Sequence, residues 1–103
     1  MKSKRSKATD IPMKVKKEVY ERDNGRCVIC GREGFPNSHY IRRSKGGLGI
    51  PENVVTMCIY CHSAYDNGYD TELKEYIKNK TKEYLMSIYK NWNEKDLIYN
   101  KWR

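Results

Sequence analysis

The sequence predicts a small α+β domain, and three observations support this fold class. The chain has 103 residues, enough for one hydrophobic core and too few for two. Apolar residues recur at helical spacing near both ends of the chain, and short strand-forming runs separated by glycine lie between them. Hydrophobic residues make up only 38% of the chain and charged residues 33%, so the core is expected to need an additional cross-link.

The N-terminal part is predicted as an arm followed by a helix. Residues 1–11 predict a basic disordered arm, because they are polar, rich in lysine and without apolar periodicity. A helix is predicted over residues 12–22, since Pro12 suits a first helical turn and Val15 and Val19 share one face. Lysines cover the rest of this helix and are expected to meet solvent or a phosphate backbone.

Two short strands are predicted in the middle of the chain, at residues 39–41 and 53–57. A glycine-rich loop at 46–49 separates them and is expected to be mobile. A helix is expected to follow Cys61 and to end by Gly68, because glycine is the common residue just after a helix.

The C-terminal region, residues 69–103, follows the core region at 12–68. A longer helix is predicted there from Asp70 or Thr71 to about Tyr89. Its apolar residues at helical spacing are Leu73, Tyr76, Ile77, Tyr84, Leu85 and Ile88. We expect them to pack on the core, with a partner surface as the alternative for some of them. The aromatic tail that follows is expected to pack on the core or on a partner.

The positive charge is concentrated in one half of the chain. The formal net charge is +8, and all of this excess falls in residues 1–50, whereas residues 51–103 carry equal numbers of acidic and basic groups. A one-sided positive field favours a polyanion such as nucleic acid, or an anionic membrane surface. The chain has no apolar run that could span a membrane and no apolar segment after its basic first residues. We therefore expect neither an integral membrane protein nor a secreted one.

The four cysteines form two identical pairs, Cys27-Val-Ile-Cys30 and Cys58-Ile-Tyr-Cys61. A gap of two residues lets both thiolates of a pair reach one ion, and two pairs complete a tetrahedron. Four thiolates in a closed shell suit Zn²⁺, which would then be structural because no position is left for water. Two disulfides are the alternative, but they need an oxidising compartment that nothing else in the sequence supports.

Both histidines of the chain belong to the segment framed by these cysteines. With Asn53, His39 and His62 make the pattern His-x13-Asn-x8-His, with Gly46-Gly47 inside it and a Cys-x-x-Cys-His end. In this combination the chain resembles the HNH endonucleases, particularly the small zinc-binding enzymes of phages and prophages. The resemblance covers about residues 14–68.

That resemblance implies a ββα-metal (His-Me finger) core held by the four-cysteine zinc site, with flanking N-terminal and C-terminal helices. His39 would be the general base that takes a proton from the attacking water, a role suited to imidazole. Asn53 would hold the hairpin loop and orient the imidazole. His62 would bind one catalytic divalent cation, Mg²⁺, Mn²⁺, Ni²⁺ or Zn²⁺. The substrate would be DNA, double-stranded, cut to 5′-phosphate and 3′-hydroxyl ends.

Two further residues are candidate ligands of the catalytic cation. Asp66 lies four residues after His62, so on a helix both side chains point the same way. Its alternative is an exposed carboxylate at a helix end. Ser38 stands where related enzymes often carry Asp or His, and a neutral hydroxyl binds cations more weakly. Ser38 is thus a direct ligand, a residue of the strand without contact to the ion, or a residue that contacts the ion through water.

Basic residues near the candidate base are expected to contact phosphates. Arg42 and Arg43 follow His39 closely, and strand alternation predicts that only one of them reaches the scissile phosphate. Lys45, Lys14 and Lys17 are expected to contact flanking phosphates, which gives affinity without sequence readout.

The sequence and the resemblance together predict a metal-dependent HNH DNA endonuclease in the cytoplasm of a bacterial host, encoded by a phage or prophage. It would act beside the packaging terminase or another phage protein, or as a homing or nicking enzyme, as a monomer or homodimer. One alternative is a non-catalytic, zinc-dependent nucleic-acid-binding module. Another is an interaction module that uses the C-terminal helix and tail.

Overall fold

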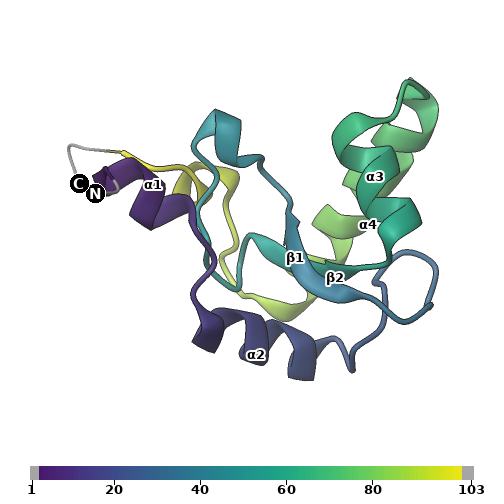
Figure 1. The fold of residues 1–103 in the computed structure, drawn as a ribbon, viewed down its shortest axis with the longest axis horizontal. Coiled ribbons are helices and arrows are strands. Elements are labelled where there is room, and N and C mark those ends of the chain that lie inside the picture. Colours follow the sequence, from purple (N-terminus) through teal and green to yellow (C-terminus); the bar gives the residue numbers. More distant parts are fainter. Residues whose placement is uncertain (1–2, 101–103) are drawn as a thin grey trace.

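The computed structural model describes residues 3–100 and confirms the α+β fold class (Figure 1). None of the helices in this range is both long enough and apolar enough to cross a membrane. The elements in chain order are α1 (Lys4–Thr9), α2 (Met13–Arg22), β1 (Phe35–His39), the 3₁₀ helix η1 (Arg43–Lys45), β2 (Val54–Met57), α3 (Ile59–Asn67), α4 (Thr71–Ile88) and the 3₁₀ helix η2 (Glu94–Leu97).

The two strands form an antiparallel sheet with helices on both faces (Figure 1). His39 pairs with Val54, and the register is irregular between Phe35 and Ser38. All four residues of β2 are buried, so this strand is the centre of the molecule. Its Val54 packs against Val15 and Val19 of α2.

The opposite face of β2 belongs to the larger hydrophobic cluster. Val55 and Met57 lie there with Ile77 and Leu85 of α4, and all four side chains are buried. Successive residues of a strand point to opposite faces, so β2 joins the two halves of the core.

The N-terminal segment is not a disordered arm, and the prediction for residues 1–11 is wrong over the part of it that the structure describes. Lys4–Thr9 form α1, which Ser3 caps by accepting a hydrogen bond from the Ser6 amide. The segment is docked by long-range contacts: the Gly49 amide donates to the Ala8 carbonyl at 3.0 Å. Composition predicted disorder because it does not reveal backbone hydrogen bonds to a distant loop.

The other helices lie close to where the sequence predicts them. The helix predicted at 12–22 is confirmed as α2, which ends before Asn24 and Gly25, both with positive φ (56° and 66°). The α4 prediction is also confirmed, with Asp70 as its N-cap. The prediction that the apolar residues of α4 pack on the core is only partly right, because Leu73, Tyr76 and Ile88 are exposed.

The strands and α3 are shifted relative to the prediction. The first strand was expected at 39–41, but β1 ends at His39, and only the Tyr40 amide continues the pairing by donating to the Asn53 carbonyl. The second strand is confirmed at 54–57. α3 begins at Ile59, three residues before the start predicted at His62, because the Cys58 side chain caps it.

The C-terminal tail packs back onto the domain as far as Asn100. Leu97 is buried, and the Trp92 indole donates to the Glu52 carbonyl at 2.8 Å. The Trp92 ring also meets Tyr40 edge-on, with 5.5 Å between ring centres. Trp102 lies outside the described residues.

A buried ion pair ties α2 to the sheet and to α4. The Arg22 guanidinium donates to both carboxylate oxygens of Asp23 at 2.7 and 3.1 Å, and to the carbonyl of Val54 at 2.8 Å. Tyr89 accepts from Arg22 at 3.0 Å, and the Tyr84 hydroxyl donates to Asp23. The Asp23 side chain is fully shielded, so these bonds replace the water that its charge has lost.

Candidate functional site

The four cysteines meet at one point on the edge of the core. The Sγ atoms of Cys27, Cys30, Cys58 and Cys61 all lie within 4.8 Å of one another, and none of these residues forms a disulfide. A tetrahedral zinc site places its sulfurs roughly 3.8 Å apart, from a Zn–S bond of about 2.3 Å. The chain therefore positions a closed four-sulfur set that can hold a metal ion, and zinc fits it.

The local backbone prepares these sulfurs for a cation. Burial opposes ionisation of Cys27, but amide donors at Cys30, Cys58 and Ile29 outweigh it and lower its pKa to about 7. Burial and the neighbouring thiols raise the pKa of Cys61, because several thiolates repel one another. A bound dication removes that repulsion, which is why such a set binds metal with release of protons.

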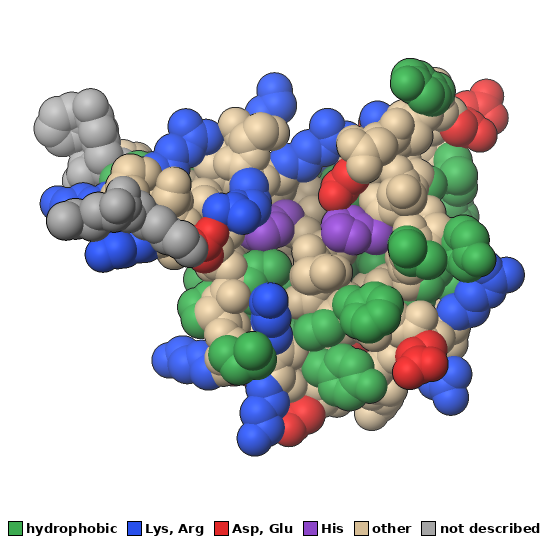
Figure 2. Space-filling view, viewed as in Figure 1, with side chains coloured by type: hydrophobic (Ala, Val, Ile, Leu, Met, Phe, Trp, Pro, Cys, Tyr) green, Lys and Arg blue, Asp and Glu red, His purple; other side chains and the backbone are tan. Residues whose placement is uncertain are grey.

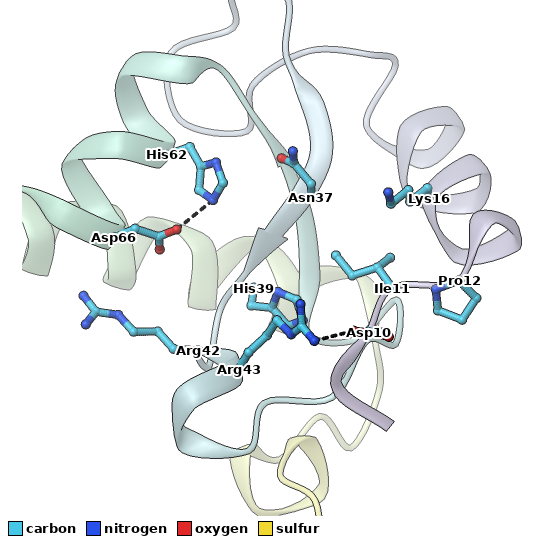
Figure 3. Close-up of a pocket in the computed structure, with 10 residues that line it drawn as sticks. All are labelled: Asp10, Ile11, Pro12, Lys16, Asn37, His39, Arg42, Arg43, His62 and Asp66. Carbon is cyan, nitrogen blue, oxygen red and sulfur yellow. Dashed lines mark hydrogen bonds and ion pairs between the residues drawn. The ribbon is translucent and has the colours of Figure 1, made fainter. Parts of the chain in front are cut away.

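Both histidines line one cleft, of about 670 Å³ (Figure 3). Figure 2 shows the two imidazoles on opposite sides of a hollow in the surface, with Lys and Arg side chains gathered above it. The N-terminal segment, α2, β1, η1 and α3 all contribute to the wall. The lining residues are Asp10, Ile11, Pro12, Lys16, Asn37, His39, Arg42, Arg43, His62 and Asp66.

His39 is held by the N-terminal segment. Its Nε2 atom lies 2.8 Å from the carbonyl oxygen of Thr9. A carbonyl can only accept, so Nε2 carries the proton and the neutral ring leaves Nδ1 as a proton acceptor. Burial lowers the pKa of His39 despite this bond, and the charge of Arg43 lowers it further. The ring is therefore mostly neutral at pH 7, the protonation state that a general base requires.

His62 and Asp66 face each other on α3. His62 Nε2 and Asp66 Oδ2 are 2.8 Å apart, across one helical turn. The hydrogen bond to Asp66 raises the pKa of His62, and the same bond lowers the pKa of Asp66. An imidazole nitrogen and a carboxylate oxygen this close can bind one divalent cation together.

Asn53 holds the loop between the strands together. Its side-chain carbonyl accepts from the Ile41 amide at 2.8 Å, and its amide donates to the carbonyls of Ile41 at 3.1 Å and Leu48 at 2.9 Å. The residue is completely buried. These bonds hold the loop directly after His39, which is one of the two roles that the resemblance implies for Asn53. The imidazole itself forms its hydrogen bond with the Thr9 carbonyl.

Ser38 does not belong to the cleft, and its prediction as a direct ligand of the catalytic cation is wrong. It is completely buried, and its hydroxyl donates to Met57 Sδ at 3.3 Å. Strand residues alternate between faces, so Ser38 points into the core while Asn37 and His39 line the cleft. The same alternation, counted back from His39, would have identified Asn37 from the sequence.

Arg42 and Arg43 both line the cleft, so they do not point to opposite faces as strand alternation predicts. The alternation argument fails because β1 already ends at His39 and η1 begins at Arg43. Arg42 donates to the Tyr65 carbonyl at 2.9 Å, whereas Arg43 forms an ion pair with Asp10.

Of the three α2 lysines that the sequence predicts to meet solvent or a phosphate backbone, one lines the cleft. Lys16 lines it, whereas Lys14 and Lys17 are exposed on other faces of α2 and are absent from its wall. Lys45 lines a second pocket next to the cleft. Helical spacing alone does not reveal which face of a short helix meets a cleft built by other elements.

Comparisons with protein-family models, with curated proteins and with solved structures gave no match to this chain. The functional argument therefore depends on the residues and their geometry.

Proposed function

We propose that this chain is a metal-dependent HNH-type endonuclease that hydrolyses phosphodiester bonds of DNA. In this proposal β1, β2 and α3 form a ββα-metal core beside the four-cysteine zinc site. The observation that carries it is the cleft, where a neutral imidazole on one side faces an imidazole–carboxylate pair on the other. General bases and cation ligands must reach the same phosphate, and a shared open cleft of this size permits that.

His39 acts as the general base through Nδ1, which takes the proton of the attacking water. The Thr9 carbonyl fixes the proton on Nε2, and the burial that lowers the pKa keeps the ring neutral. Asn53 fixes the backbone that follows the base. A base of this kind contributes about 10²- to 10⁴-fold to the rate.

His62 and Asp66 would hold the catalytic cation, as Mg²⁺, Mn²⁺, Ni²⁺ or Zn²⁺. When bound, the cation supplies positive charge to the phosphate oxygens and to the leaving 3′ oxygen. Arg42, Arg43 and Lys16 add positive charge to the same wall, which favours a polyanion there. From the family resemblance we place the activity in the bacterial cytoplasm, beside a phage terminase or another phage protein.

The test is cleavage of supercoiled plasmid with each of the four cations. We expect nicking or linearisation by the wild type and a rate at least a hundredfold lower for His39→Ala. Tyr69→Ala, at a fully exposed position outside the cleft wall, should cut like the wild type. The proposal fails if no cation supports cutting, or if His39→Ala cuts as fast as Tyr69→Ala.

One observation favours a second candidate, a zinc-dependent module that binds nucleic acid without cutting it. With Ser38 turned into the core, His62 and Asp66 are the ligand pair left on the α3 side of the cleft. Two protein ligands hold a cation weakly. Binding of DNA by the wild type, with no cutting at any cation concentration, would favour this module over the nuclease.

A further inference from the structure

A second pocket, of about 300 Å³, adjoins the cleft on the side of α4. Arg42 lines both cavities, so they share a wall. The Arg42 guanidinium is held at this boundary by its hydrogen bond to the Tyr65 carbonyl, at 2.9 Å. An extended ligand that lies in the cleft can therefore continue past the fixed positive charge of Arg42 into the second pocket.

The second pocket is rich in basic groups from two separate elements. Lys45 comes from η1, and Lys74 and Lys78 come from α4. The two α4 lysines are four residues apart, so they lie one above the other on the same helix face. Lys74 is half-buried, which keeps its charge next to the pocket.

Two carboxylates also line this pocket, and one of them is already engaged. Glu94 accepts a hydrogen bond from the Tyr40 hydroxyl at 2.5 Å and lies 3.5 Å from Lys82. Glu75 is the other. The basic groups outnumber the acidic ones, and Lys82 adds a further positive charge beside Glu94. The pocket thus suits an anion held by several cations.

We propose that this second pocket binds a backbone phosphate of the nucleic acid whose scissile phosphate lies in the cleft. The inference rests on the proposed function only in taking nucleic acid as the occupant of the cleft. Arg42 would contact the strand between the two sites, and Lys45, Lys74 and Lys78 would neutralise the flanking phosphate. α4 then acts as part of the substrate-binding surface, beyond its packing on the sheet.

The test compares two double variants with the same loss of charge, both in the His39→Ala background so that DNA is bound without being cut. Lys74→Gln/Lys78→Gln removes the pocket lysines. Lys80→Gln/Lys90→Gln removes exposed lysines that do not line the pocket. Binding of a fluorescein-labelled DNA duplex is measured by anisotropy over a range of salt concentrations, and circular dichroism verifies that both variants are folded.

We expect the pocket variant to bind about tenfold more weakly at moderate salt, as for the loss of a charge-assisted hydrogen bond. Its slope of log affinity against log salt should be smaller by about one, which corresponds to one phosphate contact. The control should change affinity less than twofold. Equal effects of the two double variants would overturn the proposal, because only net charge would then matter, as would failure of the His39→Ala protein to bind DNA.

A titration with inorganic phosphate at constant ionic strength separates a nucleic-acid phosphate from a free one. Saturable phosphate binding that needs Lys74 and Lys78, with equal DNA binding by both double variants, would assign the pocket to a free anion and overturn the proposal. The nuclease hypothesis can fail while this proposal holds. If the wild type cuts no DNA, and the pocket variant binds DNA poorly while the control variant binds it normally, the second pocket binds a phosphate of DNA in a protein that is not a nuclease.

Discussion

At the scale of single residues, the environment of His39 decides what its ring can do. The Thr9 carbonyl determines which nitrogen carries the proton, and burial determines whether a second proton binds. Three charged groups also change the pKa of the ring: Arg43 and His62 lower it, and Asp66 raises it. Burial is the largest influence, so the net effect is a pKa below the ordinary value of 6.5.

This shift predicts the pH dependence of cleavage. A base with a lowered pKa is mostly deprotonated near neutrality, so kcat/KM should pass half of its maximum below pH 6.5 and level off above that pH. Rates are measured on plasmid with the cation saturating at every pH, and Tyr69→Ala serves as the matched control. A half-maximal rate above pH 6.5 would contradict the assignment of His39 as a buried neutral base.

At the scale of elements, the N-terminal segment after α1 is part of the candidate site. Gly49 lies against it so closely that an added Cβ would come within 1.9 Å of the Asp10 carbonyl oxygen. Gly49→Ala should therefore push away the segment that carries the Thr9 carbonyl and lower the cleavage rate at least tenfold. Asn53 and the cysteines keep their contacts, so zinc content should stay at the wild-type level.

The control for that variant is Ala8→Gly, which keeps the carbonyl that Gly49 contacts and adds no atoms. It should cut at close to the wild-type rate. Wild-type activity in Gly49→Ala, with the protein folded, would show that the segment does not position His39.

The elements also show what the sequence could and could not predict. α2 and α4 were predictable because their apolar spacing and their end signals agree. The four cysteines were predictable because their two Cys-x-x-Cys pairs have the spacing of a metal site, whereas the role of Asn53 followed from the resemblance alone. Ser38 was predicted on the wrong face because the resemblance implied a ligand there, whereas strand alternation counted from His39 places it in the core. α1 was missed because its stability comes from a distant loop.

At the scale of the whole molecule, a metal ion held by the four-cysteine cluster would compensate for a thin core. Structural zinc can contribute on the order of 10–16 kcal/mol of apparent binding free energy to folding. Strong chelation should therefore unfold the domain, with loss of the helical circular dichroism signal. Mild EDTA should stop cleavage first, because the His62–Asp66 pair offers fewer ligands.

Cys30 provides the matched variant, because it is exposed and its replacement by serine removes a ligand with little loss of packing. Cys30→Ser should lower zinc content and melting temperature together, measured by metal analysis and thermal unfolding. Simultaneous loss of fold and cleavage along the EDTA titration would show that the two cation sites do not differ in affinity.

Two neighbouring amides in the loop between the strands form hydrogen bonds to segments near opposite ends of the chain. The Leu48 amide donates to the Leu97 carbonyl, whereas the Gly49 amide donates to the Ala8 carbonyl. Detachment of the C-terminal tail would free the first proton for solvent exchange, and detachment of the N-terminal segment would free the second. Adjacent peptide groups thus report separately on the opening of opposite ends of the chain.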